Sequence, residues 1–218
     1  MKNKRHIKSF NEYQEKLNIK TNNESDLVDV GKQFLPNKSA HINIPTPDSV
    51  SIKMIKFAKS NSELNQFLDL GSGNGDVLKT SSNFFDANFG IELSDKYIEY
   101  SLNNLDQKQN VKIIKGDLLS RETYKQIPQK PTFVYSYLPF TGRTTYNKSS
   151  NMSEQSIRMN KMFDIVYDYF PSGSIFFFKS WSYKKNNEMN ITNKDVSFLN
   201  FSYQEFGFRE NEVMMLKK

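Results

Sequence analysis

Three glycines at alternate positions follow an apolar run in the stretch "LDLGSGNGDV", residues 68–77. A strand that turns through Gly71, Gly73 and Gly75 into a helix lets the backbone pass close to a ligand at the carboxyl edge of a sheet. A P-loop requires Gly-x4-Gly-Lys-Ser/Thr, which is absent, and the dinucleotide fingerprint Gly-x-Gly-x-x-Gly is spaced differently. The loop alone therefore has two interpretations, an ordinary turn or a site for a nucleotide-like ligand.

The chain around this loop alternates between strand-like and helix-like patterns. Strand-like runs occur at 67–71, 89–93, 111–117, 132–140 and 172–181. The segments between most of them carry apolar side chains at helical spacing. This alternation predicts an α/β fold with a parallel sheet and helices on both faces. Two last runs, 196–208 and 211–218, predict a terminal antiparallel pair joined by a short turn.

Helical spacing also suggests how the chain is divided. Apolar side chains between residues 7 and 17 predict an amphipathic helix. We therefore divide the chain into an N-terminal helical extension, residues 1–40, and one α/β domain, residues 41–218.

A further helix is predicted over 94–105, directly after the second strand. Ser94 is expected to cap its first turn. The apolar residues expected to face inward are Ile98, Leu102 and Leu105.

Composition argues against several kinds of chemistry. The 218 residues contain no cysteine, and the two histidines, His6 and His41, lie too far apart for a standard ligand pair, so we expect no metal site. The sequence holds no run of about twenty apolar residues, so we expect a soluble, cytoplasmic protein with no membrane contact. The net charge of +6 favours anionic partners, although lysines scattered over a solvated surface are the simpler explanation.

Two acidic residues follow the next two predicted strands. Glu92 ends the second strand, about twenty residues beyond the glycine loop, where a carboxylate can accept from both hydroxyls of a ribose. Asp117 ends the third strand, where it can accept from an exocyclic adenine amine. Either acid alone is more simply a helix cap or a turn residue. Together with the loop, in this order, they predict one adenosine-sized pocket.

The stretches "FLDLGSGNG", "GIEL" and "KGDLL" resemble the successive motifs of class I S-adenosylmethionine-dependent methyltransferases. The resemblance implies a Rossmann-like, mostly parallel seven-stranded sheet, with S-adenosylmethionine as cofactor and S-adenosylhomocysteine as product. It places Asp69 and the glycines at the methionine end, Glu92 at the ribose and Asp117 at the adenine. The cofactor-binding residues that it implies within these motifs are Asp69, Gly71, Gly73, Gly75, Glu92, Leu93, Asp117 and Leu118.

The segment before the glycine strand narrows the resemblance. "NIPTPDSVSIKMIKFA" is similar to the Pro-Thr-Pro segment and helix of compact protein-lysine methyltransferases of archaeal type and their mitochondrial relatives. The resemblance implies that Pro45 and Thr46 cover the cofactor and that the main partner is a protein substrate. A second interpretation is equally good: Thr46 and Pro47 simply begin a helix.

The fourth strand ends in "YLPF", residues 137–140. Enzymes that methylate base amines carry a four-residue motif there: Asp or Asn, then two prolines, then Tyr or Phe. In this chain only Pro139 and Phe140 fit that motif. We expect the catalytic residues to be Tyr137, Pro139 and Phe140, with Tyr137 lining the acceptor channel. RNA or a small molecule stays open as the acceptor, and so does a catalytically silent module that retains the cofactor pocket.

Overall fold

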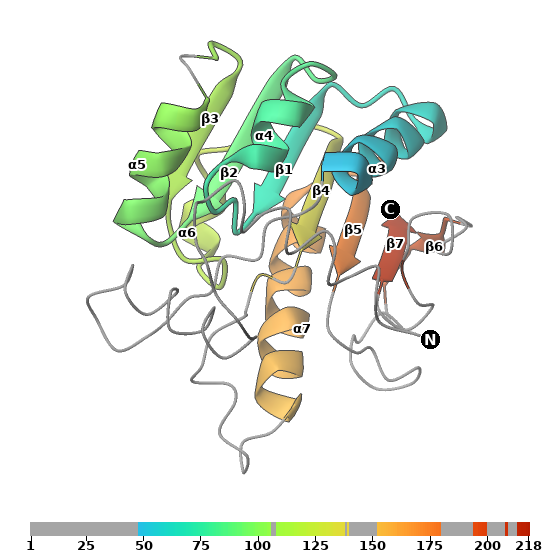
Figure 1. The fold of residues 1–218 in the computed structure, drawn as a ribbon. Coiled ribbons are helices and arrows are strands. Elements are labelled where there is room, and N and C mark those ends of the chain that lie inside the picture. The colour runs from blue at the N-terminus through green and yellow to red at the C-terminus, as the bar shows by residue number, and fades with distance from the viewer. Residues whose placement is uncertain are drawn as a thin grey trace, which may run out of the picture.

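In the computed structural model, the described residues are 48–105, 108–137, 139, 152–179, 194–199, 208 and 213–218. They form one sheet of seven strands in the order β3-β2-β1-β4-β5-β7-β6, with helices against it (Figure 1). The strands are β1 Gln66–Leu70, β2 Ala87–Glu92, β3 Val111–Lys115, β4 Thr132–Tyr137, β5 Ile175–Lys179, β6 Ser197–Phe198 and β7 Val213–Lys217. The helices are α3 Asp48–Asn61, α4 Asp76–Ser81, α5 Asp95–Asn104, α6 Arg121–Tyr124 and α7 Met152–Tyr169.

The first five strands are parallel, as the alternation of strands and helices predicts. β1 lies between β2 and β4, with Leu68 opposite Phe89 on one side and Val134 on the other. β7 joins β5 in the antiparallel direction, and β6 pairs antiparallel with β7. The expected α/β class, the seven-stranded Rossmann-like sheet and the terminal antiparallel pair are therefore confirmed.

Strand residues alternate between two apolar layers. Phe67, Phe133 and Phe177 face one layer, which α3 and α4 cover with Met54 and Leu78. Leu68, Val134 and Phe176 face the other layer, which α7 covers with Met162 and Val166. Neighbouring residues of β5 are fully buried on opposite faces, which explains why residues 175–178, "IFFF", form a continuous apolar run. Helices therefore cover both faces of the sheet.

Two local predictions differ from the structure. The described part of β6 is only two residues long, and Phe208, inside the predicted strand 196–208, lies outside any strand. In α5, Leu102 is 60% exposed, whereas the neighbouring Ser101 is fully buried. The face of α5 that packs inward therefore runs through Ser101 and Leu105, because side chains four positions apart share one face of a helix.

The N-terminal helix predicted over 7–17 and the division at residue 40 fall outside the described residues. No helix in the described ranges contains a stretch long and apolar enough to cross a membrane.

Candidate cofactor-binding site

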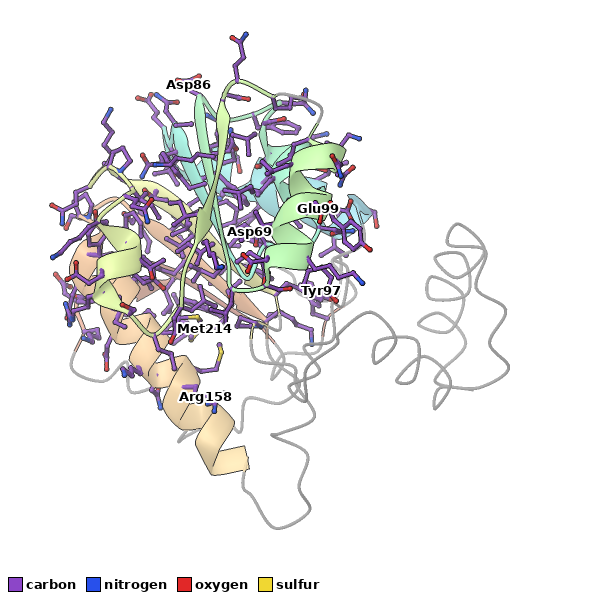
Figure 2. The ribbon with its side chains drawn as sticks, turned by 90° about the vertical axis from the view of Figure 1, so that its left-hand side faces the viewer. Asp69, Asp86, Tyr97, Glu99, Arg158 and Met214 are labelled. Atoms are coloured by element: carbon purple, nitrogen blue, oxygen red, sulfur yellow. The ribbon has the colours of Figure 1, made fainter. Side chains whose placement is uncertain are left out.

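The sheet brings the three predicted binding elements to one edge. β3, β2 and β1 are neighbours and run in the same direction, so their carboxyl ends lie side by side. Asp117 follows β3, Glu92 ends β2, and the glycine turn 71–75 follows β1. Figure 2 labels Asp69 near this edge and Asp86 at the opposite end of β2. We call this region the cofactor edge.

The glycine turn has a backbone that other residues rarely adopt. Gly71, Gly73 and Gly75 have φ angles of 79°, 53° and 82°, all in the left-handed region. The amides of Gly71 and Ser72 both donate to the Ile91 carbonyl, at 2.9 and 3.0 Å, which ties the turn to β2. A side chain at any of the three glycines would strain the turn.

Glu92 is held by backbone amides at the middle of the edge. Its Oε2 accepts from the Gly73 amide at 3.0 Å, and its Oε1 accepts from the amides of Leu93 and Ser94, each at 2.9 Å. Ser94 occupies the N-cap position of α5 but makes no capping bond with its side chain. The carboxylate instead accepts from the two amides that precede the first turn of α5. It stays half-buried, and one lone pair on Oε2 is left for a further donor.

The third element presents one acid and buries its neighbour. Asp117 is exposed, and only its Oδ1 has a described donor, the Leu119 amide at 2.8 Å. Leu118 is 8% exposed and packs in the apolar layer beside α7, away from solvent. Leu93, by contrast, is 52% exposed next to Glu92. Of the two leucines, Leu93 is thus the one that can offer apolar surface to a ligand.

Asp69 is a buried acid beneath the turn. It is 4% exposed. It lies two positions after Phe67 on β1 and therefore on the same face of the sheet, the one that α3 and α4 cover. Its pKa is raised to about 8, first because burial disfavours the charged form and then because the carboxylates of Glu92 and Asp76 repel it. Such a carboxyl favours a nearby cation, because a positive charge would restore its ionised form.

The carboxyl ends of β4 and β5 form the other half of this edge. Pro139 lies beside the glycine turn, since a β-carbon added to Gly71 would sit 3.6 Å from the Pro139 Cα. Tyr135 is fully buried and stacks on Phe177 at 5.0 Å, whereas Tyr137 is half-buried at the end of the strand. Tyr137 is therefore the tyrosine nearer the edge, as expected, and Phe140 lies outside the described residues.

Sequence reasoning missed a buried cation on this side. Lys179 ends β5 opposite Tyr137 and is only 5% exposed. Its Nζ lies 5.8 Å from the centre of the Phe208 ring, and that ring lies 6.4 Å from the Tyr137 ring. The signal in the sequence was a lysine closing an otherwise apolar strand.

The remaining expected site residues lie beyond what the structure describes. Pro45 and Thr46 precede the first described residue of α3. Within the described ranges, no group of three or more His, Asp or Glu side chains is placed to hold a metal ion.

Comparisons with known proteins agree with the fold. No protein-family model and no curated sequence matches the chain. Protein SMU.1697c from Streptococcus mutans, solved with S-adenosylhomocysteine, is 13% identical, with a TM-score of 0.53 over 81% of this chain and 99% of that one. An RNA methyltransferase from Salinibacter ruber, also solved with S-adenosylhomocysteine, is 16% identical, with a TM-score of 0.50 over 79% of this chain and 92% of that one.

A third neighbour is longer than this chain. An S-adenosylmethionine-dependent methyltransferase from Clostridium acetobutylicum is 17% identical, with a TM-score of 0.47 over 73% of this chain, and the match spans only 59% of its own length. At these identities the likeness concerns architecture. The chain has the fold of the class I S-adenosylmethionine-dependent methyltransferases.

Proposed function

We propose that this chain binds S-adenosylmethionine at the cofactor edge and transfers its methyl group to an acceptor nucleophile, leaving S-adenosylhomocysteine. The observation that carries the proposal is that Asp117, Glu92 and the glycine turn lie side by side at the ends of three neighbouring strands. Their order across the sheet matches the order of base, ribose and amino-acid portions along the cofactor.

The free acceptor atoms of this edge suit an adenosine. Glu92 is fixed by three backbone amides and keeps one lone pair on Oε2 that can accept from a ribose hydroxyl. Asp117 has one carboxylate oxygen without a described donor, which can accept from the adenine amine. The exposed Leu93 can lie against the apolar faces of the nucleoside.

The residues around Asp69 suit the charged end of the cofactor. The sulfonium group, when bound, supplies an activated methyl group that needs little further chemical activation. Asp69 can offset the positive charge, and Pro139 narrows the space above Gly71. The protein's task is then to align donor and acceptor and to exclude water.

A protein lysine amine is our first candidate for the acceptor. Such an amine must lose a proton from a pKa near 10.4, and an apolar pocket favours this loss. The half-buried Tyr137 and the ring of Phe208 offer apolar and aromatic surface on the acceptor side. The Pro-Thr-Pro resemblance supports the same acceptor.

An acceptor that carries an anionic group, such as RNA or a small acid, is the second candidate. Lys179 supports it, because a lysine beside Tyr137 adds positive charge on this side of the edge. The net charge of +6 points the same way. Replacing Lys179 with Met should raise the KM for an anionic acceptor at least about tenfold and leave the affinity for S-adenosylmethionine unchanged.

Methyl transfer from labelled S-adenosylmethionine to separated protein, RNA and small-molecule fractions of a cell lysate tests the proposal. We expect label in one fraction with the wild-type chain and at least about a hundredfold less with Glu92→Ala. Glu63→Ala removes an exposed carboxylate before β1, at the opposite edge of the sheet, and should behave like the wild type. Cofactor binding without label in any fraction would instead indicate a silent binding module.

A further inference from the structure

The inner face of α5 carries two polar side chains that contact the glycine turn. Ser101 is fully buried, and its Oγ donates to the Gly73 carbonyl at 2.9 Å. Asn104, three positions later and thus on the same face, donates from Nδ2 to the Asn74 carbonyl at 3.0 Å and to the Asp76 carboxylate at 2.8 Å. These three hydrogen bonds join segments that lie 28 to 30 residues apart in the chain.

These contacts do little for α5 itself. A buried inward position on a helix normally takes an apolar residue, and serine and asparagine are poorer helix formers than alanine or leucine. Neither side chain bonds to the carbonyls of its own helix within the described residues. Two of their three partners lie in the turn and the third, Asp76, begins α4 directly after it, so the turn is where their effect should be found.

The turn has a conformation that needs support from outside. Its three glycines adopt left-handed φ angles, which glycine tolerates. Fixing three flexible glycines in one conformation costs much backbone entropy. Ser101 also packs directly on the turn, because a β-carbon added to Gly75 would lie 2.9 Å from its Oγ. By accepting these donors, the Gly73 and Asn74 carbonyls are drawn toward α5.

The ribose-side acid lies at the end of β2, just before the same helix. α5 begins three residues after Glu92, and Glu92 accepts from the Gly73 amide at 3.0 Å. Gly73 is therefore held on two sides, its amide by Glu92 and its carbonyl by Ser101. This double hold fixes the separation between the ribose position and the turn.

We propose that Ser101 and Asn104 are positioning residues for the amino-acid portion of S-adenosylmethionine, acting through the glycine turn. The inference rests on the proposed function, which places the adenosine at Asp117 and Glu92 and the remaining portion at the turn after β1. It assigns to α5 the task of holding the turn ready before the ligand arrives, so that binding does not have to order it.

Two ligands separate this role from general stabilisation of the fold. S-adenosylhomocysteine carries both the adenosine and the amino-acid portion, whereas 5′-methylthioadenosine lacks the latter. Titration calorimetry with Ser101→Ala and Asn104→Ala should show S-adenosylhomocysteine affinity falling about tenfold in each, because a buried or partly buried turn carbonyl loses its donor. The affinity for 5′-methylthioadenosine should stay within about twofold of the wild-type value.

Asn103→Ala is the matched control, because Asn103 is exposed on the same helix and the substitution changes helix propensity equally. It should leave both affinities unchanged. An equal loss of both ligands in the two test variants, or no loss of either, would overturn the positioning role. If Ser101→Ala fails to fold, as judged by its thermal melting, Asn104→Ala alone decides the question. Failure of the wild-type chain to bind S-adenosylhomocysteine would instead reject the proposed function.

Discussion

Among the described residues, Asp69 is a carboxyl whose chemistry departs far from its ordinary behaviour. Burial and the neighbouring carboxylates of Glu92 and Asp76 raise its pKa to about 8, so it is largely protonated near neutral pH. The raised pKa depends on burial and on the nearby carboxylates of Glu92 and Asp76, and no sequence pattern reveals both. The motif "LDLG" located the residue correctly, but only the structure indicates that its carboxyl is protonated.

This proton makes cofactor binding depend on pH. A bound sulfonium and α-ammonium favour the ionised carboxylate, so binding near pH 7 should release up to about one proton. The affinity for S-adenosylmethionine should therefore rise as the pH increases from about 6 to about 8. Calorimetry in buffers with different ionisation enthalpies measures the proton count. Asp69→Asn should bind more weakly, release no such proton and show a flat profile over this range, whereas equal release by both proteins would refute the role of Asp69.

Other residues show where sequence patterns mislead. The spacing of Ile98, Leu102 and Leu105 favours an apolar face on α5. Leu105 is buried as expected, but Leu102 is exposed and Ser101, one residue earlier, is buried in its place. Its place on the inner face depends on a carbonyl 28 residues away, which periodicity along one helix does not encode. Lys179 was likewise missed, because a lysine at the end of an apolar strand usually reaches solvent.

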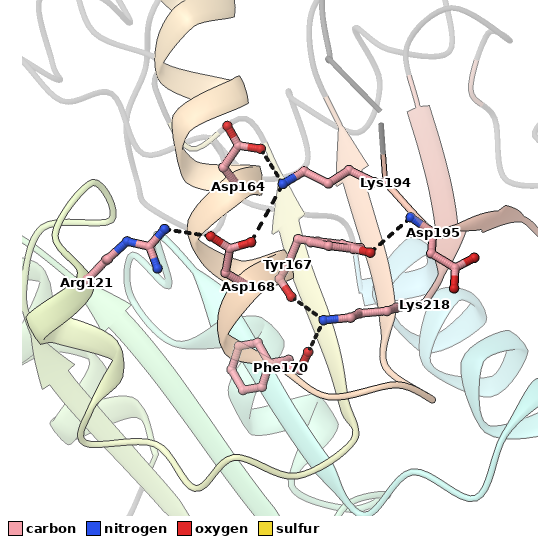
Figure 3. Close-up of polar contacts among 8 residues, drawn as sticks. All are labelled: Arg121, Asp164, Tyr167, Asp168, Phe170, Lys194, Asp195 and Lys218. Carbon is pink, nitrogen blue, oxygen red and sulfur yellow. Dashed lines mark hydrogen bonds and ion pairs between the residues drawn. The ribbon is translucent and has the colours of Figure 1, made fainter. Parts of the chain in front are cut away.

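At the scale of elements, one polar network joins α7 to α6 and to the chain before β6. The Lys194 ammonium lies 2.9 Å from Asp164 and 3.7 Å from Asp168, and Arg121 lies 2.6 Å from Asp168 (Figure 3). Burial alone would lower the pKa of Lys194, but the hydrogen bond and charge of Asp164 outweigh it and the pKa is raised. The hydrogen bond from Arg121 holds the pKa of Asp168 below its ordinary value.

The tyrosine at the centre of this network is flanked by two cations. The Nζ atoms of Lys194 and Lys218 lie 4.6 and 4.2 Å from the centre of the Tyr167 ring. Lys218 also donates to the carbonyls of Tyr167 and Phe170 at 2.7 and 2.9 Å, which satisfies carbonyls at the end of α7. The terminal strands are therefore attached to α7 as well as to β5.

Lys194→Met should lower the free energy of unfolding by about 1 kcal/mol, because it removes the charge that pairs with two partly exposed carboxylates. The loss should shrink at high salt, where the wild-type pairs are screened. Urea denaturation at low and high salt measures both effects. Lys108→Met, at an exposed lysine, is the control and should change stability little. An equal effect of the two substitutions would show that the network contributes nothing measurable.

At the scale of the whole molecule, the sequence predicted the architecture better than its details. The alternation of strands and helices and the order of the binding motifs were sufficient to predict the seven strands. They also predicted the sheet edge at which Glu92 and Asp117 lie. The order of the C-terminal strands, with β7 between β5 and β6, depends on side-chain packing between distant segments. The identity of the acceptor is least accessible, because methyl transfer from a sulfonium asks little of side chains.

The core, including the terminal strands, should unfold as one cooperative unit. Phe177 is fully buried in β5, between the parallel half of the sheet and β7, and it stacks on Tyr135. Phe177→Ala should cost about 3–5 kcal/mol of unfolding free energy. Phe198→Ala, on β6, is a matched control, because that ring is 65% exposed. Denaturation followed by circular dichroism checks both, and a small loss at Phe177 would contradict the packing described here.

The most direct test of the account is calorimetric titration of the full chain with S-adenosylmethionine, repeated with Glu92→Ala and Glu63→Ala. The account predicts one binding site per chain, an affinity at least about a hundredfold weaker in Glu92→Ala, and no change in Glu63→Ala. Absence of binding to the folded wild-type chain, or equal affinities in all three proteins, would contradict a cofactor site at the ends of β1, β2 and β3.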